Sequence, residues 1–319
     1  MHEKNDLISI AMTSYNGEKY IREQLDSILT QTYGNFELII CDDRSKDSTV
    51  EIIKDYCIKD SRIKLYVNEK NLGFKKNFEK AISLCKGEYI ALSDQDDIWL
   101  PEHLEKLMEL VQGHLIACGN AELIDENNNS KGINLNETEG LHKFEDSDNL
   151  LYKLFCTRNP FQGASMLMHR SFFEKALPIP ENIPFHDTWF AFCSCFSDRI
   201  RYTFDIITRY RQHTTQVTQH NKRSTLTLIR TCISRIFERK KYETDRFDYI
   251  NELKKRYSVT AGQEKIIQDC IFYFNMRARK LPLAGRIKAL KMIWNNYDHI
   301  FTTSRQKYRF FLMAVYFIF

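Results

Sequence analysis

The sequence predicts an α/β fold in which a mainly parallel sheet is flanked by helices and followed by a helical C-terminal extension. The first 125 residues alternate short apolar runs with segments of helical period, which is the pattern of βαβ units. Residues 222–319 have instead a helical, basic and aromatic pattern. The chain has 319 residues, of which 43% are hydrophobic, so it is long enough for roughly two domains and a sizeable core.

The first two strands are expected at Leu7–Met12 and Phe36–Cys41, which are short apolar runs. Between them, the apolar side chains after Gly17 recur at i, i+4, i+7 and i+8, so they share one face of an amphipathic helix. These side chains are Ile21, Leu25, Ile28 and Leu29.

The second helix is expected to begin at Ser48, which has capping-box spacing to Glu51. The alternating residues Ile63–Val67 predict the third strand, and a third helix follows at about Lys75–Cys85. The short apolar run Tyr89–Leu92 predicts a fourth strand, which ends just before an acidic cluster.

The remaining elements are predicted from shorter signals. Pro101 suits the first turn of a helix, because its missing N–H would be unpaired there. Leu115–Gly119 and Gly163–Met168 are expected strands, and Asp125–Asn129 is an expected turn. Asp187–Phe196 is an expected buried helix.

The charge of the chain is uneven along its length. Its net charge is +4, but residues 222–319 hold 21 Lys and Arg against 8 Asp and Glu, a balance of +13. Residues 1–221 hold 25 against 34, a balance of −9. We therefore expect one domain over residues 1–221 and a second region over residues 222–319.

The sequence predicts a cytoplasmic location. Met1–Ile10 lacks the basic start and the apolar run of a secretory signal. The nine cysteines are scattered and form no CxxC pair, which favours reduced thiols over disulfides or a zinc site.

The basic C-terminal region has competing interpretations. Tyr308–Phe319 is an apolar run of twelve residues, shorter than the roughly 20 needed to span a bilayer. It is either an interfacial anchor or a helix docked on the protein's own core. We predict peripheral contact with an anionic membrane, against the alternative of a solvated helical face. Nucleic-acid binding is disfavoured because no recognisable module accompanies the charge.

Polar side chains follow three of the expected strands, where ligands of open α/β sheets bind. They are the segments Thr13–Gly17, Asp42–Ser45 and Asp94–Asp97. A single Asp in such a place is more often a turn former or a helix cap. Three polar clusters at successive strand ends favour one shared ligand instead.

The chemistry of these clusters suits a nucleotide diphosphate held by a metal. Carboxylates at i and i+2 on an extended segment point the same way and suit Mg²⁺ or Mn²⁺. Asp42 or Asp43 would accept the N3–H of uracil or thymine, and Tyr15 offers a ring face for the base. A dinucleotide-dependent oxidoreductase is disfavoured because no GxGxxG follows the first strand.

Residues 7–125 contain four characteristic segments: ISIAMTSYNGEKYIREQLDSILTQTY, ELIICDDRSKDST, NLGFKKNFEKA and GEYIALSDQDDIWLP. In their order and spacing, these segments resemble the nucleotide-sugar-binding half of family 2 glycosyltransferases. The SDQDDIW form and the later segments FQGASMLMHR, FHDTW and RYRQH are similar to bacterial members that build surface polysaccharides, including rhamnosyltransferase-like enzymes. The resemblance covers about 215 residues and does not extend to residues 222–319.

The resemblance implies a GT-A fold with a nucleotide-sugar half at residues 1–125 and an acceptor half at residues 126–221. It also implies an inverting transfer from a UDP- or dTDP-sugar to a hydroxyl of a glycan or lipid-linked acceptor. The cofactor would be Mg²⁺ or Mn²⁺, and the product would enter a cell-surface polysaccharide.

The resemblance assigns roles by position. Asp187 would be the catalytic base, with capping of its helix as the alternative, and it stands beside His186 and Trp189 at the acceptor. Thr13, Tyr15 and Asp43 would hold the base and ribose, Asp94 the ribose or metal, and Asp96 the metal. The remaining assigned residues are Lys76 near the nucleotide, Arg211 on the diphosphate in a mobile segment at residues 209–213, His213 as a further metal ligand, and Gln162 and Gly163 at the acceptor.

A second hypothesis follows from the pair His186-Asp187, which stands where the family often has Glu-Asp. In this hypothesis the chain is a catalytically inactive scaffold subunit that binds nucleotide-sugar. Turnover in the wild type and in Asp187→Asn distinguishes the two.

Overall fold

The structure is a computed structural model that describes residues 6–135, 147–156, 159–198, 200–214, 239–277 and 282–295. The chain divides into two compact units. The N-terminal unit comprises residues 1–138, 160–179 and 185–214, and the C-terminal unit comprises residues 139–159, 180–184 and 215–319. The domain boundary expected at residue 221 lies outside the described residues.

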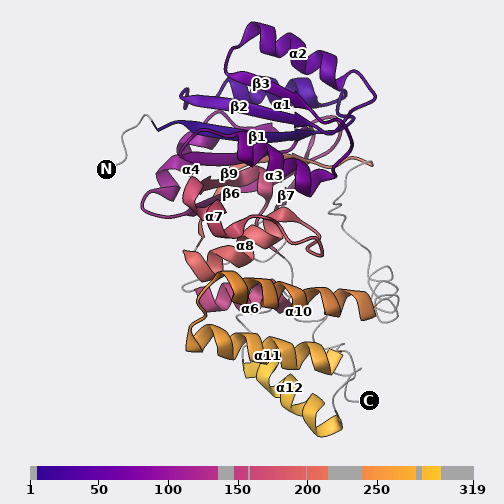
Figure 1. Cartoon of the computed structure of the whole chain (residues 1–319), viewed down its shortest axis with the longest axis vertical. Helices are drawn as coiled ribbons and strands as arrows, with labels where there is room; N and C mark the ends of the chain where they lie inside the picture. The colour runs from indigo at the N-terminus through magenta and orange to yellow at the C-terminus, as the bar shows by residue number, and fades with distance from the viewer. Residues whose placement is uncertain are drawn as a thin grey trace. The chain divides into compact units, whose positions relative to one another are not determined.

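The N-terminal unit is built on one mixed sheet, several strands of which are labelled in Figure 1. The strand order is β3-β2-β1-β4-β8-β6-β9-β5, and β7 pairs with β6. The strands β3, β2, β1 and β4 are mutually parallel, and β6 and β9 are also parallel, whereas β8, β5 and β7 pair antiparallel. The strands are β1 Ile8–Ser14, β2 Phe36–Asp42, β3 Ile63–Val67, β4 Tyr89–Ser93, β5 Ile98–Trp99, β6 Ile116–Ile124, β7 Ser130–Asn134, β8 Met166–His169 and β9 Arg201–Arg211.

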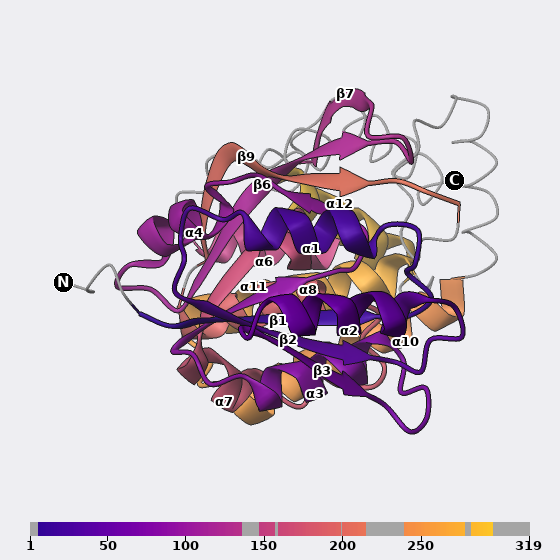
Figure 2. The ribbon, with the colours of Figure 1, turned by 90° about the horizontal axis from the view of Figure 1, so that it is seen from above.

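Helices cover both faces of this sheet, which confirms the predicted α/β class. Figure 2 shows α1 and α3 on opposite sides of β1 and β2. The helices of this unit are α1 Ile21–Leu29, α2 Thr49–Lys59, α3 Phe74–Leu84, α4 His103–Val111, α7 Phe173–Ala176 and α8 His186–Ser197, with short 3₁₀ turns at Gly163–Ser165 and Arg170–Phe172.

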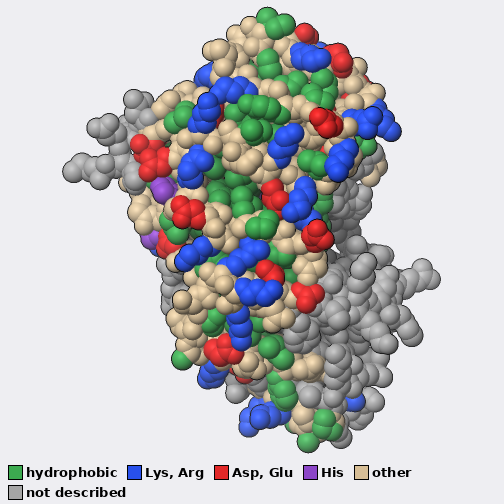
Figure 3. All heavy atoms as spheres, viewed as in Figure 1, with side chains coloured by type: hydrophobic (Ala, Val, Ile, Leu, Met, Phe, Trp, Pro, Cys, Tyr) green, Lys and Arg blue, Asp and Glu red, His purple; other side chains and the backbone are tan. Residues whose placement is uncertain are grey.

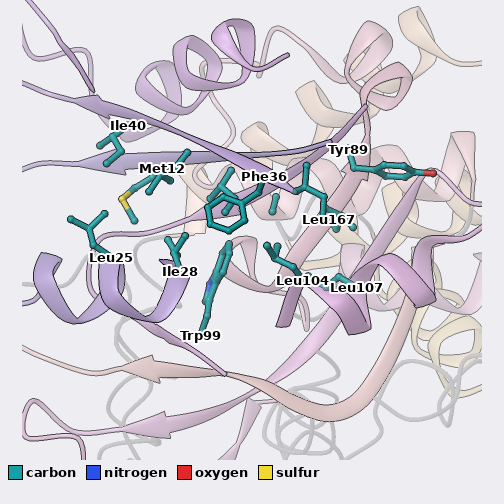
Figure 4. Close-up of a cluster of buried hydrophobic side chains, with 14 of the residues drawn as sticks. Met12, Leu25, Ile28, Phe36, Ile40, Tyr89, Trp99, Leu104, Leu107 and Leu167 are labelled. Atoms are coloured by element: carbon teal, nitrogen blue, oxygen red, sulfur yellow. The ribbon is translucent and has the colours of Figure 1, made fainter. Parts of the chain in front are cut away.

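The core forms where alternate strand residues meet the apolar faces of α1, α2 and α4. Met12 and Ile40 point from the strands toward Leu25 and Ile28 of α1, as Figure 4 shows. Trp99 packs in the same cluster and is only 2% exposed. The helical spacing seen in the sequence therefore corresponds to a buried face.

Two local features differ from expectation. The expected capping box is not formed, because the Ser48 side chain makes no cap hydrogen bond and its backbone N–H donates instead to Glu18 Oε2 at 2.9 Å. Strand β9 was not predicted from the sequence. Its outer half, Arg201–Asp205, is partly exposed and mixes charged with aromatic residues, so it carries no clean alternation.

The described surface of the N-terminal unit carries mixed charge. On the face shown in Figure 3, Lys and Arg side chains are interspersed with Asp and Glu over the described residues of this unit. The surplus of acidic residues in the first 221 positions is therefore not gathered on that face.

The C-terminal unit is helical in its described residues, as the sequence predicts. Its helices are α6 Ser147–Cys156, α10 Arg239–Arg256, α11 Ala261–Arg277 and α12 Leu283–Asn295, and α11 contacts the other three. The Tyr152 hydroxyl donates to Asp269 Oδ2 at 2.7 Å and joins α6 to α11. Among the described residues, the helices are too short or too polar to cross a bilayer. The apolar run Tyr308–Phe319 lies outside the described residues.

Candidate active site

The carboxyl ends of three parallel strands meet at one edge of the sheet. Strand β1 lies between β2 and β4, and all three run in the same direction. The segments that follow them begin at Tyr15, Asp43 and Asp94, so these residues lie at neighbouring strand ends. The backbone N–H of Asp43 donates to Ser14 O at 2.8 Å and joins two of the ends directly.

The segment after β1 presents an aromatic ring. The Tyr15 side chain is 43% exposed, whereas Thr13 is buried within the strand. The backbone of Tyr15 is held by Gln95, whose Oε1 accepts from Tyr15 N at 2.8 Å and whose Nε2 donates to Tyr15 O at 3.0 Å. The ring is therefore accessible while its backbone is fixed.

Asp43 is engaged by the chain itself. Its Oδ1 accepts from Asn68 Nδ2 at 2.9 Å and from Leu72 N at 2.7 Å, and its Oδ2 accepts from Gly73 N at 2.8 Å. Gly73 has a φ of 77°, which glycine adopts without strain. Asp43 thus organises the segment that leads into α3.

Asp42 is fully buried and also has partners within the chain. It accepts hydrogen bonds from the hydroxyls of Ser14 and Ser45, at 2.8 and 2.6 Å. It therefore fixes the turn after β2. Of the two aspartates offered by the sequence as base ligands, Asp43 is the one beside the segment at residues 68–73.

Carboxylates from two distant segments lie close together at the end of β4. Burial and the negative charges of Asp96 and Asp187 raise the pKa of the Asp94 carboxyl to about 7. Burial and the charges of Asp96 and Asp94 likewise raise the pKa of Asp97 well above its ordinary value. In the described structure Asp97 Oδ2 has no hydrogen-bond partner. The site therefore concentrates negative charge that is only partly compensated.

His213 lies beside this cluster. Its Nε2 is 2.7 Å from Asp96 Oδ2, and its ring packs 5.0 Å from the ring of Tyr20. Within the described ranges, three or more His, Cys, Asp or Glu side chains do not form a preformed metal cage. Mg²⁺ is commonly held by one or two protein carboxylates plus substrate phosphates, so a partly compensated acidic site of this kind fits such an ion.

Arg211 has a structural position that corrects the expected contact with diphosphate. Its side chain is 1% exposed, and its Nε donates to Asp96 O at 2.8 Å. Its other nitrogens bond Glu23 Oε2 at 2.6 Å and Asn128 Oδ1, and its guanidinium lies over the Tyr20 ring. Residues 209–211 also belong to strand β9 rather than to a loop. Arg211 therefore joins the acidic segment to α1 and to the 125–129 turn.

Asp187 lies in the first turn of α8, close enough to raise the pKa of Asp94. Its Oδ1 accepts a hydrogen bond from the backbone N–H of Thr188. The N-cap of α8 is Phe185, which makes no side-chain cap hydrogen bond, so the capping role considered for Asp187 is not observed. Its negative charge acts on the acidic cluster through Asp94.

His186 and Gln162 bring unpartnered polar atoms to the start of α8. His186 is buried against Phe78 with a ring separation of 4.2 Å, and burial lowers the pKa of its imidazole to about 3. Both of its ring nitrogens and Gln162 Oε1 lack hydrogen-bond partners in the described structure. A Cβ on Gly163 would lie 2.5 Å from His186 Nε2, so glycine permits this close approach.

Two further predicted site residues have other surroundings. Trp189 is fully buried and its indole N–H donates to Ala176 O at 2.6 Å, so its ring is not available to pack against a sugar. This corrects its expected place at the acceptor. Lys76 pairs with Glu79 at 2.8 Å in the first turns of α3, as a solvated surface lysine does.

Gln95 is the residue at this site that the sequence did not single out. Its carboxylate neighbours carry the recognisable signal, and a glutamine between two aspartates gives no indication of its partner. Its partner, Tyr15, is 80 positions away in the chain.

One protein family and several known glycosyltransferases are similar in sequence to this chain. Residues 9–177 match the profile described as Glycosyl transferase family 2. An uncharacterized glycosyltransferase of Methanocaldococcus jannaschii is 32% identical over 209 residues, which cover 64% of this chain and 69% of the relative. The Escherichia coli enzyme UDP-Glc:alpha-D-GlcNAc-diphosphoundecaprenol beta-1,3-glucosyltransferase WfgD is 41% identical over 123 residues, 38% of this chain and about half (48%) of the relative.

Solved structures share the fold at low sequence identity. TarS of S. aureus in complex with UDP-GlcNAc has a TM-score of 0.62 and 16% identity, over 92% of this chain and 81% of that one. The mannosyltransferase PcManGT of Pyrobaculum calidifontis, in complex with GDP-Man and Mn²⁺, has a TM-score of 0.56 and 13% identity, over 99% and 86%. Because the profile covers more than half of the chain, the expected family is confirmed: the chain belongs to glycosyl transferase family 2 and is a glycosyltransferase of GT-A fold.

Proposed function

We propose that this chain moves a sugar, with inversion, from a UDP- or dTDP-sugar to a hydroxyl of a glycan or lipid-linked acceptor in surface-polysaccharide synthesis. The observation that carries the proposal is the shared neighbourhood of Asp94, Asp96 and Asp187 beside the carboxyl ends of parallel strands. The name of WfgD, a UDP-Glc enzyme with a diphosphoundecaprenol acceptor, and the UDP-GlcNAc complex of TarS support this class of donor and acceptor.

The donor nucleotide would lie across the ends of β2, β1 and β4. The exposed Tyr15 ring would supply a stacking face for a pyrimidine. Thr13, near the end of β1, and Asp43, directly after β2, would contact the base and ribose. The Lys76 ammonium, 43% exposed, is available to a phosphate oxygen if its pair with Glu79 opens. Arg211 would not contact the diphosphate, because its side chain is buried.

Asp96 and His213 would hold a Mg²⁺ or Mn²⁺ ion, with Asp94 as the adjacent carboxylate on ribose or metal. Such an ion, when bound, supplies positive charge that stabilises the departing nucleoside diphosphate. The carboxylates of this chain contribute oxygen ligands of the kind that hard divalent cations prefer.

Asp187 would act as the general base at the acceptor. As the acceptor oxygen forms its bond to the anomeric carbon, the bond from that carbon to the diphosphate oxygen breaks, and the hydroxyl proton passes to the Asp187 carboxylate. A single displacement of this kind inverts the anomeric centre. Gln162 and His186, with unpartnered polar atoms beside Gly163, would bind acceptor hydroxyls.

The test is turnover with defined donors. Purified protein is incubated with UDP- and dTDP-sugars, Mn²⁺ and lipid-linked or glycan acceptors, and release of nucleoside diphosphate is measured. We expect Asp187→Asn to slow transfer by about 10²- to 10⁴-fold with unchanged UDP affinity. Asp198→Asn is the matched control, since that aspartate pairs with His114 instead.

The same assay distinguishes the scaffold alternative. Tight UDP binding by the wild type without turnover for any donor would favour an inactive nucleotide-sugar-binding subunit. Full activity in Asp187→Asn would remove Asp187 as the base.

We further propose that the enzyme works at the cytoplasmic face of a membrane. Helix α12 exposes Ile287 and Trp294, at 51% and 65%, together with Lys288 and Lys291. Exposed aromatic and basic side chains on one helix suit an anionic bilayer surface. We expect Lys288→Glu with Lys291→Glu to reduce co-sedimentation with anionic vesicles at low salt. Equal sedimentation of this variant and the wild type would contradict the proposal.

A further inference from the structure

The amide of Gln95 joins the two segments that would hold opposite ends of the donor nucleotide. We propose that Gln95 is a positioning residue that couples the segment carrying Tyr15 to the acidic segment carrying Asp94 and Asp96. The inference rests on the proposed function, because it takes the nucleotide to bind across these two segments.

The geometry of the contact fixes the amide at both of its ends. Gln95 Oε1 accepts from Tyr15 N at 2.8 Å, and Gln95 Nε2 donates to Tyr15 O at 3.0 Å. A backbone N–H requires an acceptor and a backbone carbonyl requires a donor, so the orientation of the amide is dictated by its partner. A carboxylate in this place has no donor for Tyr15 O, so Glu does not replace Gln.

Gly17 gives an independent observation of the same contact. A Cβ built on Gly17 would lie 2.2 Å from Gln95 Oε1 and 2.5 Å from its Cδ. Gly17 does not have a positive φ, so its backbone does not itself demand glycine. The absence of a side chain at Gly17 therefore matters because it leaves space for the Gln95 amide.

The position of Gln95 in the chain gives the contact its consequence. Its neighbours on either side are Asp94 and Asp96, and Asp96 is bonded to His213. The Gln95 side chain would therefore set the distance between the Tyr15 backbone and the Asp96 carboxylate. It would thereby also set the position of a bound diphosphate relative to Tyr15. Without the amide, the two segments can shift relative to one another. The nucleotide base and its phosphates can then no longer contact both segments in their best positions at the same time.

The test uses UDP and dTDP as probes, with and without Mn²⁺, by calorimetric titration of the full chain. Loss of two hydrogen bonds predicts that Gln95→Ala weakens binding in Mn²⁺ by about tenfold. Gly17→Ala should weaken it similarly, because the new methyl displaces the amide. In the double variant, Gly17→Ala should not weaken nucleotide binding beyond the effect of Gln95→Ala, because the amide with which the new methyl would clash is absent.

A second readout separates positioning from loss of stability. The factor by which Mn²⁺ improves UDP affinity should shrink in both single variants, which a uniformly destabilised but folded protein does not show. Gln31→Ala is the matched amide control, because Gln31 joins Ser27 O and Leu100 O outside the site. Gly34→Ala is the matched glycine control, because a Cβ there meets nothing within 4 Å.

The outcomes are distinguishable. Wild-type affinity in Gln95→Ala, or fully additive losses in the double variant, would overturn the coupling and leave the proposed function intact. If the wild type binds neither UDP nor dTDP, the proposed function fails first. Should Gln95→Ala not fold, Gly17→Ala alone still tests the inference, with unchanged affinity counting against it.

Discussion

His213 Nε2 lies 2.7 Å from Asp96 Oδ2, and this contact joins the short segment that follows β9 to the acidic segment after β4. The two side chains are 9% and 14% exposed, so the contact is shielded from bulk water. Burial and the negative charges of Asp96 and Asp187 raise the pKa of Asp94, and additional positive charge at this place would relieve the repulsive contribution.

We predict that Mn²⁺ stabilises the wild-type chain against thermal unfolding and that Asp96→Asn abolishes this stabilisation. A ligand at a hundred times its dissociation constant adds about 2.7 kcal/mol to the free energy of unfolding. His114 and Asp198 form a comparable pair outside the acidic cluster, with His114 Nδ1 3.2 Å from Asp198 Oδ2. Asp198→Asn should therefore keep the Mn²⁺ response, and loss of the response in both variants would contradict the assignment.

We predict that Gly163→Ala lowers the free energy of unfolding by about 1–3 kcal/mol, because the new methyl overlaps the ring of His186. Urea unfolding measures the effect. In a His186→Ala background the same substitution should cost much less, since the opposing ring is removed. Equal costs in the two backgrounds would show that the close approach does not matter.

We predict that the stability of the chain falls as pH falls below 6.5, in part because of His103. Burial lowers the pKa of His103 to about 3, from an ordinary value of 6.5. Between these values the unfolded chain binds a proton that the folded chain excludes, at up to about 1.4 kcal/mol per pH unit. In His103→Gln this contribution is absent. The difference in the free energy of unfolding between the wild type and the variant, measured at pH 8, should therefore narrow toward pH 4.5. A difference that stays constant across that range would contradict the prediction.

We predict that Arg211→Lys lowers the free energy of unfolding by about 2 kcal/mol. Lysine cannot bond Asp96 O, Glu23 and Asn128 at once, and the site is 1% exposed. Arg209, on the same strand and 47% exposed, provides the matched control. Arg209→Lys should change the stability by less than about 0.5 kcal/mol.

The strand ends of the N-terminal half were predictable because parallel strands bring their carboxyl ends together. Apolar runs located β1, β2 and β4, and the adjacency of Tyr15, Asp43 and Asp94 followed from that topology. The roles of single residues were less predictable, because they depend on partners far along the chain. Arg211 suits a phosphate in isolation, and only its contact with Glu23, 188 positions away, shows its structural use.

Burial decided the cases in which residue type alone was ambiguous. Trp189 has the chemistry of a sugar-stacking platform, but its indole N–H faces the carbonyl of Ala176 inside the protein. Gln95 carried no sequence signal because an amide between two acids has many possible partners. Local patterns thus indicated where the site lies, and long-range packing determined which side chains face it.

The N-terminal unit ends at Thr214, one residue beyond His213. The polypeptide that leads on to the helical unit therefore departs directly from a proposed metal ligand. A change in backbone conformation at Thr214 would therefore act on the His213 imidazole through only a few covalent bonds.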